Sequence, residues 1–170
     1  MEPEFAEGNF LGLPEVEDAA DIIIASIPYE LTTSYGQGTA DGPAACIAAS
    51  GQVELYDELL DEELPAGAVI RTIEPWNGEG ATLHEQLDGI TEYAKEQYDS
   101  TAFPIFLGGE HGILPAIVRA MPSAVTIVQI DAHADLRDQL DGEERSHACA
   151  AARALDVGAK ALYQVGIRAY

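Results

Sequence analysis

Short runs of consecutive apolar residues recur along this 170-residue sequence, and helix-forming stretches separate them. The clearest runs are residues 21–27, 103–107 and 124–130. Their apolar residues follow one another instead of alternating with polar ones, which is typical of strands buried on both faces. Strands of this kind belong to parallel sheets, and helices cover the faces of such sheets. The sequence therefore predicts an α/β fold with a mostly parallel sheet.

Helices and weaker strands fill the rest of the pattern. Residues 81–98 place apolar side chains near helical spacing, which predicts a helix. The Thr-, Ser- and Gly-rich residues 29–43 predict a long loop, and such loops in compact domains are often functional. No repeat or change of composition divides the chain, so we expect a single domain over residues 1–170. Further helices are predicted from near Pro43, over 112–121 and over 146–155, with strands over 53–59, 68–73 and 161–167.

The chain is strongly acidic, with 30 acidic side chains against 8 basic ones and a formal net charge of −22. One explanation is a surface that attracts a polycationic ligand, and the other is adaptation to high salt, where dispersed carboxylates keep a protein hydrated. The acids are spread over the whole chain, which favours salt adaptation and a halophilic source. Nucleic acid is not expected as a partner, because neutralising phosphates requires Lys and Arg.

Other features of the sequence exclude further classes. The apolar runs are too short to cross a bilayer, so no contact with a membrane is expected. The acidic start lacks the basic and apolar pattern of a secretory signal, and we expect a cytoplasmic location. Cys46 and Cys149 are far apart and show no metal-type spacing, so two buried small side chains explain them better than a disulfide.

The most informative residues follow the run at 124–130 directly and read Asp131-Ala132-His133-Ala134-Asp135. In open α/β sheets, ligands bind beyond the carboxyl ends of the strands. If the chain stays extended for one step, Asp131 and His133 point to the same side. Carboxylate oxygen and imidazole nitrogen together suit Mn²⁺, Fe²⁺ or Zn²⁺. A solvated polar loop is the alternative, since acids are frequent in this chain.

A second motif, Gly108-Gly109-Glu110-His111, also follows an apolar run. If the two strands are parallel, His111 emerges at the same sheet edge as Asp131, and the glycines allow the backbone to turn there. His111 alone could be an ordinary residue at the start of a helix. Two histidines and two acids at one edge favour a metal site.

Four motifs taken in order resemble those of agmatinases and related ureohydrolases: GGEH at 108–111, DAHAD at 131–135, SHA at 146–148 and VGIR at 165–168. The loop over residues 28–43 is similar to an early segment of the same family, so the resemblance covers nearly the whole chain. It implies an arginase-like three-layer α/β sandwich. It also implies a binuclear manganese enzyme that hydrolyses a small guanidinium substrate, converting agmatine to putrescine and urea in polyamine biosynthesis.

The resemblance also implies roles for individual residues. His111 and Asp135 would bind one Mn²⁺, His133 would bind the other, and Asp131 would bridge the pair. Asp135 would accept a hydrogen bond from the attacking hydroxide, and His147 would contact substrate or move a proton. For His147, a solvent-exposed position at a helix start is the alternative. Glu110 is expected to support the ligands and not to bind metal itself.

The sequence departs from the family pattern in two respects. Gly112 stands where the family usually has Ser. A later Ser-x-Asp-x-Asp motif and a guanidinium-binding glutamate are absent from these 170 residues, which leaves the second manganese site incomplete. We therefore expect a carboxyl-terminally truncated form of the fold that works as a homo-oligomer or with a carboxyl-terminal partner chain. The alternatives are a non-catalytic homologue that binds metal or a partner, and arginase or formiminoglutamase specificity.

Overall fold

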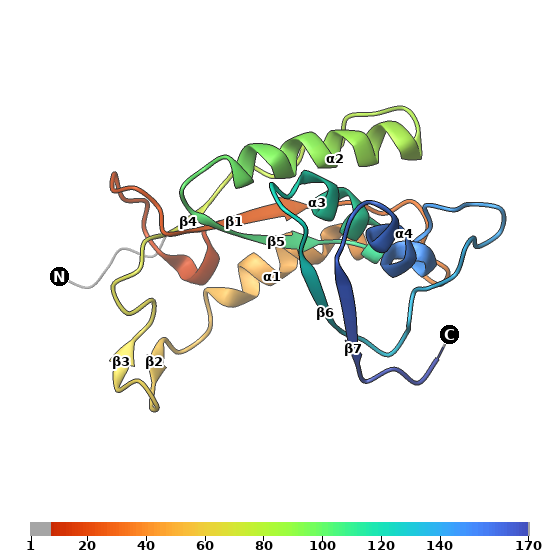
Figure 1. Cartoon of the computed structure of the whole chain (residues 1–170). Helices are drawn as coiled ribbons and strands as arrows, with labels where there is room; N and C mark the ends of the chain where they lie inside the picture. Colours follow the sequence, from red (N-terminus) through yellow and green to blue (C-terminus); the bar gives the residue numbers. More distant parts are fainter. Residues whose placement is uncertain (1–7, 170) are drawn as a thin grey trace.

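The computed structural model describes residues 8–169, and its helices and strands alternate along the chain (Figure 1). This alternation confirms the α/β fold with parallel strands. No helix in residues 8–169 is long and apolar enough to cross a bilayer. The main elements are β1 (Ile22–Ile27), α1 (Gly42–Ser50), β4 (Ile70–Thr72), α2 (Leu83–Tyr98), β5 (Phe103–Gly108), α3 (Leu114–Ala120), β6 (Thr126–Ile130), α4 (Ala150–Asp156) and β7 (Ala161–Val165).

Several short elements connect the main ones. The strand predicted over residues 53–59 is wrong in extent: only β2 (Tyr56–Asp57) forms there, and it pairs with β3 (Glu62–Glu63) in a small antiparallel hairpin. The hydroxyl of Tyr56 donates to Asp61 at 2.6 Å within this hairpin. Within residues 8–169 the 3-10 turns are η1 (Phe10–Gly12), η2 (Thr39–Asp41), η3 (His111–Ile113) and η4 (His147–Cys149).

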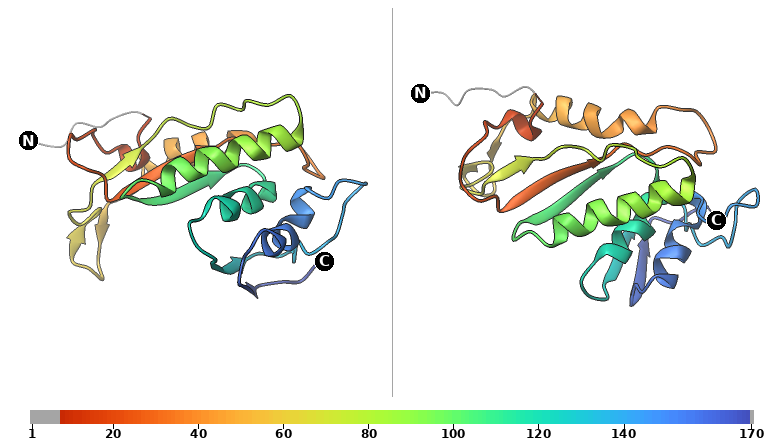
Figure 2. Two further views of the ribbon diagram at one scale, coloured as in Figure 1. Left: turned by 45° about the horizontal axis from the view of Figure 1, so that its top comes forward. Right: turned by 90° about the horizontal axis from the view of Figure 1, so that it is seen from above.

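The first sheet has the strand order β4-β1-β5, with both pairs parallel. Helix α1 covers one face of this sheet and α2 covers the other (Figure 2). Helix α2 starts with a capping box, in which Thr82 and Glu85 each accept from the other's backbone N–H. Its apolar stripe then packs on the sheet, so the core gathers around β1 and α2. The buried residues of this core cluster are Ile27, Tyr29, Trp76, Leu87, Ile90, Ile113 and Ala116.

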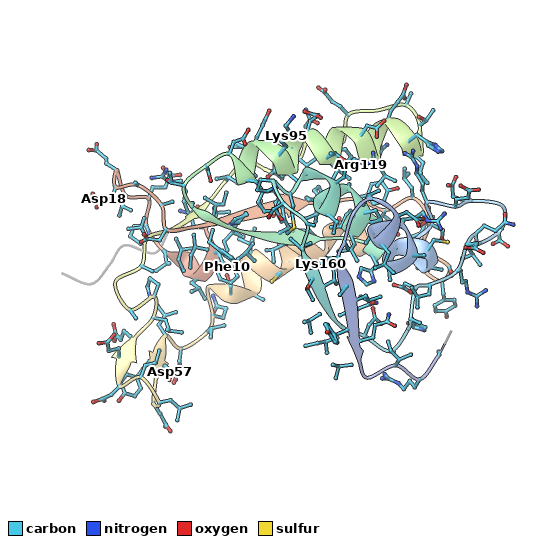
Figure 3. The ribbon with its side chains drawn as sticks, in the orientation of Figure 1. Phe10, Asp18, Asp57, Lys95, Arg119 and Lys160 are labelled. Atoms are coloured by element: carbon cyan, nitrogen blue, oxygen red, sulfur yellow. The ribbon has the colours of Figure 1, made fainter. Side chains whose placement is uncertain are left out.

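The second sheet consists of β6 and β7, paired in parallel. In Figure 1 these strands run across the direction of β1 and β5. Within the described residues, β5 and β6 do not pair with each other, so two sheets stand where the sequence predicted one. Helix α4 packs on β7, and α3 packs on both α2 and α4. Arg119 of α3 (Figure 3) forms an ion pair with Asp88 of α2 at 3.2 Å.

Burial of the strands agrees with the sequence prediction for β1 but not for β5 and β6. Strand β1 is buried as its sequence predicts, since Ile24 and Ile27 are almost fully enclosed. Strands β5 and β6 leave large apolar side chains in solvent, with Phe103 69% exposed and Ile130 84% exposed. Tyr163 and Val165 of β7 are also exposed. The apolar runs at 103–107 and 124–130 therefore form strands that the rest of residues 8–169 covers only in part.

Candidate metal centre

The turns that follow β5 and β6 bring three ligand-type side chains together. His111, Asp131 and Asp135 each offer one ligand atom, and these atoms all lie within 4.8 Å of one another. His111 Nδ1 is 2.6 Å from Asp135 Oδ2 and 3.3 Å from Asp131 Oδ2. One imidazole and two carboxylates at this spacing fit a single Mn²⁺, Fe²⁺ or Zn²⁺ ion. The strand ends thus converge even though the strands belong to different sheets.

Close packing at Gly109 sets the position of His111. The N–H of Gly109 donates to Ile27 O at 3.1 Å, and the N–H of Glu110 donates to Tyr29 O at 3.0 Å. A Cβ atom at position 109 would overlap the carbonyl oxygen of Tyr29. Only glycine allows the backbone to pass so close to Tyr29. The chain then turns into η3, and His111 is its first residue.

Asp131 lies between the two histidines and directs one carboxylate oxygen towards each. Its Oδ2 is 3.3 Å from His111 Nδ1, and its Oδ1 is 3.7 Å from His133 Nδ1. The backbone N–H of His133 donates to Asp131 Oδ1 at 2.9 Å, and this bond is the main reason that the pKa of Asp131 is lowered. The side chain of His133 is 65% exposed and lies outside the three-residue cluster.

Two glutamines that the sequence analysis did not single out hold the turn after β6. Buried Gln129 donates from Nε2 to Asp131 Oδ2 at 3.4 Å and to the carbonyl of His133 at 3.3 Å. Gln164 of β7 donates to Gln129 Oε1 at 2.8 Å and to the carbonyl of Ala134 at 2.6 Å. The sequence signal that could have found them is an amide side chain one residue before the end of each of two mainly apolar strands, since a buried amide needs hydrogen-bond partners.

Asp135 is buried and sits in the left-handed backbone region with φ 52°. A residue other than glycine is uncommon there, although Asp tolerates the region better than most. Its carbonyl accepts from the N–H groups of Ala151 and Ala152 at 3.0 and 3.2 Å. These groups belong to the first turn of α4, where backbone donors lack helical partners. These two hydrogen bonds therefore stabilise the left-handed backbone at Asp135, whose side chain contacts His111.

The electrostatics of the cluster favour a proton on His111. The hydrogen bond with Asp135 raises the pKa of His111 most strongly, and the charges of Asp135 and Asp131 add to it. Partial burial acts in the opposite direction and is outweighed. A metal ion that binds at Nδ1 must therefore displace a stabilised proton.

His147, the other histidine singled out from the sequence, lies at the start of η4 and outside the cluster. It lines the same cleft of about 480 Å³ as His111, Asp131, His133 and Asp135. Its ring nitrogens lie 3.3 Å from the hydroxyls of Thr32 and Ser34. The long loop over residues 29–43 thus forms one wall of the site.

Glu30 and Glu110 order that loop from two directions. Glu30 accepts from the N–H groups of Gly38 at 2.9 Å and Ala40 at 3.1 Å, and the bond from Ala40 is the main reason that the pKa of Glu30 is lowered. Glu110 lies after β5, is buried, and accepts from Leu31 and Thr32. Glu110 is not part of the cluster of His111, Asp131 and Asp135, and its carboxylate contacts the loop instead.

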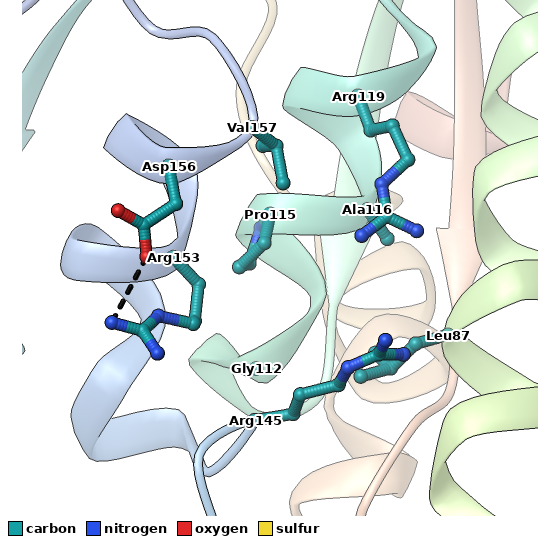
Figure 4. Close-up of a pocket in the computed structure, with 9 residues that line it drawn as sticks. All are labelled: Leu87, Gly112, Pro115, Ala116, Arg119, Arg145, Arg153, Asp156 and Val157. Atoms are coloured by element: carbon teal, nitrogen blue, oxygen red, sulfur yellow. Dashed lines mark ion pairs between the residues drawn. The ribbon is translucent and has the colours of Figure 1, made fainter. Parts of the chain in front are cut away.

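A separate pocket of about 60 Å³ lies between α2, α3 and α4 (Figure 4). Arg119, Arg145 and Arg153 line it. Arg153 forms an ion pair with Asp156 at 2.9 Å, and Asp88 faces the other two arginines at 3.2 and 4.0 Å. None of the ligand residues singled out from the sequence lines this pocket. The cleft at the strand ends is therefore the candidate site.

Comparisons with known proteins agree with one another. The model of the arginase family matches residues 20–170. The N(1)-aminopropylagmatine ureohydrolase of Synechocystis sp. is 38% identical over 164 residues, covering 89% of this chain and 52% of the relative. The agmatinase of Bacillus anthracis is 32% identical over 165 residues, which cover 91% of this chain and 54% of that relative. The solved arginase from Medicago truncatula superposes with a TM-score of 0.80 at 30% identity, covering 89% and 52%. The chain spans about half the length of these relatives.

Proposed function

This chain belongs to the arginase family, and from that membership we propose that it carries the amino-terminal part of an agmatinase-type active site. The proposed substrate is a small guanidinium compound such as agmatine, from which hydrolysis releases urea and putrescine. Relatives named agmatinase and N(1)-aminopropylagmatine ureohydrolase support this substrate class. The observation that carries the proposal is the convergence of His111, Asp131 and Asp135 at one point of the cleft.

We propose Mn²⁺ as the metal and two positions for it. His111, Asp131 and Asp135 would hold the first ion. His133 and the shared Asp131 would hold the second, since the two oxygens of Asp131 face different histidines. A bound metal pair would supply Lewis-acid activation of the attacking water and of the substrate. Within these residues the second position has only two protein ligands, so it is expected to bind weakly until further carboxylates are added.

The remaining residues of the cleft would handle the substrate and the proton. Asp135 is buried beside His111 and would accept a hydrogen bond from the attacking oxygen. His147 lines the same cleft and would contact substrate or move a proton. The volume of about 480 Å³ lies within the usual range for small-molecule sites. The carboxylates on its wall favour a cationic substrate such as a guanidinium.

We propose further that a segment outside these residues completes the sheet and the ligand set. Strands β5 and β6 each have an unpaired edge within the described residues, and their apolar side chains are exposed. A cleft of about 550 Å³ lies between them, lined by Gly108, Ile113, Val128 and Ile130. His111 and Asp131 line its end, so a strand added in parallel there would finish beside the metal cluster. A carboxyl-terminal partner chain fits this cleft better than a second copy of this chain, because the unpaired edges of β5 and β6 can each pair with an added strand.

Urea release tests the proposal. We expect little or no urea from agmatine with the purified chain in molar salt and Mn²⁺. Activity should appear when the carboxyl-terminal half of the Synechocystis relative is co-expressed, and Asp131→Ala should abolish it. Mn²⁺ uptake without urea under every condition would favour the non-catalytic alternative. Turnover of arginine in place of agmatine would favour arginase specificity.

A further inference from the structure

Glu110 joins three segments of the chain through a short series of hydrogen bonds. Its buried carboxylate accepts from the N–H of Leu31 at 2.9 Å, the N–H of Thr32 at 2.7 Å and the hydroxyl of Thr32 at 2.6 Å. Three donors around one buried group match an ionised carboxylate, which can only accept. The hydroxyl of Thr32 therefore directs its proton to Glu110.

The use of that proton determines what else Thr32 can do. A threonine hydroxyl has one proton and two lone pairs, so Thr32 Oγ1 can only accept from its other neighbours. The backbone N–H of His147 donates to Thr32 Oγ1 at 2.9 Å. His147 Nδ1 lies 3.3 Å from the same oxygen, and this contact is favourable only if Nδ1 carries a hydrogen.

We propose that Thr32, fixed by Glu110, is a positioning residue that sets the tautomer of His147. Neutral imidazole protonates one nitrogen and leaves the other as an acceptor. With the proton on Nδ1, the lone pair of Nε2 is available beside the hydroxyl of Ser34 at 3.3 Å. His147 then meets the cleft as a proton acceptor. The assignment of the tautomer stands by itself, and only its use in turnover rests on the proposed function.

Ser146 provides the competing explanation. Its hydroxyl lies 3.3 Å from His147 Nδ1 and also accepts from the N–H of Ala148 at 3.4 Å. If Ser146 donated to Nδ1, the tautomer would be reversed, and the lone pairs of Nδ1 and Thr32 Oγ1 would face each other. The hydrogen bond between Thr32 and Glu110 is shorter and charge-assisted, so it determines the arrangement.

Gly112 gives Glu110 the room that this arrangement needs. A Cβ atom at position 112 would lie 2.9 Å from Glu110 Oε1, the oxygen that accepts from Thr32. A larger residue would push the end of the Glu110 side chain away from the loop. Glycine in place of the family's usual Ser at position 112 therefore leaves room for the contact between Glu110 and Thr32.

Nitrogen NMR of the ring-labelled full chain tests the inference without substrate or metal. The spectra are recorded at a pH where His147 is neutral, and the His147→Gln variant assigns its signals. We expect Nδ1 protonated and Nε2 unprotonated in the wild-type chain and in Thr32→Ser. Thr32→Val keeps the shape but removes the hydroxyl, and it should move the population towards the Nε2-protonated form.

Two further variants keep the result decisive. Ser146→Ala should leave the tautomer unchanged, and Gly112→Ala should shift it in the same direction as Thr32→Val, even if Thr32→Val does not fold. The inference would be overturned if the wild-type ring were protonated at Nε2. It would also be overturned if Ser146→Ala changed the tautomer and Gly112→Ala did not. In the complemented enzyme, Thr32→Val should lower kcat with little change in KM, and Thr32→Ser should restore it. If the complemented enzyme released no urea, the proposed function would be refuted, but the tautomer measured by NMR would still hold.

Discussion

Metal uptake by this chain should depend on pH through a single proton on His111. That proton lies on Nδ1, between Asp135 at 2.6 Å and Asp131 at 3.3 Å. The hydrogen bond with Asp135 is the largest of the effects that raise the pKa of His111. Mn²⁺ binds neutral imidazole, so the proton must leave when the metal enters.

The size of the effect follows from this count. Loss of one proton changes the affinity about tenfold per pH unit, or about 1.4 kcal/mol, at every pH below the pKa of His111. That pKa lies above the usual histidine value of about 6.5. Between pH ~5.5 and ~6.5, Kd for Mn²⁺ should therefore fall about tenfold, and it should level off at higher pH. The same shift stabilises the metal-free fold below pH ~6.5, and this stability is lost as pH rises through the raised pKa.

Asp135→Asn separates the two contributions of Asp135. Asn tolerates the left-handed backbone at φ 52°, so the turn should survive. The pKa of His111 should fall, which moves the break in the pH profile to lower pH. The loss of an anionic ligand should weaken binding on the plateau as well.

Calorimetric titration with Mn²⁺ in two buffers of different ionisation enthalpy measures Kd and the protons released. We expect about one proton per metal at pH ~5.5, and the number should fall as pH rises through the raised pKa of His111. His133→Ala is the control, because proton release should persist if His111 is the source. A Kd that stays constant across this range, or the same break in wild type and Asp135→Asn, would show that the proton on His111 does not compete with the metal.

Three further outcomes are expected. An Asp131→Ala, His133→Ala double variant should take up far less Mn²⁺ than wild type by calorimetry, and equal uptake would refute the ligand assignment. The melting temperature should rise between low and molar KCl, because salt screens the self-repulsion of a chain with net charge −22; an unchanged value would contradict salt adaptation. Gly109→Ala should lower stability by about 1–3 kcal/mol in chemical denaturation, since its Cβ would overlap the carbonyl of Tyr29. Gly42→Ala, whose Cβ would make only an ordinary contact with Gly108, is the matched control.

The sequence was sufficient where the signal is local. Unbroken apolar runs located β1, β5 and β6, because strand formation depends on neighbouring residues. Helical spacing located α2 for the same reason. Side-chain chemistry at strand ends singled out His111, Asp131 and Asp135. The sequence predicted that they meet at one sheet edge, and they do meet, but from the ends of strands in two sheets.

Only the tertiary structure decided how these parts meet. The exposure of Ile130 and the separation of β5 from β6 depend on which edges find partners, and the local sequence does not contain that information. Thr32 contacts Glu110 from 78 residues away and His147 from 115 residues away, so no spacing rule could find these contacts. The left-handed backbone of Asp135 likewise persists because α4, a later segment, donates to its carbonyl. Such contacts form only after the helices have packed. For that reason the sequence indicated the candidate ligands, and the packed chain set their geometry.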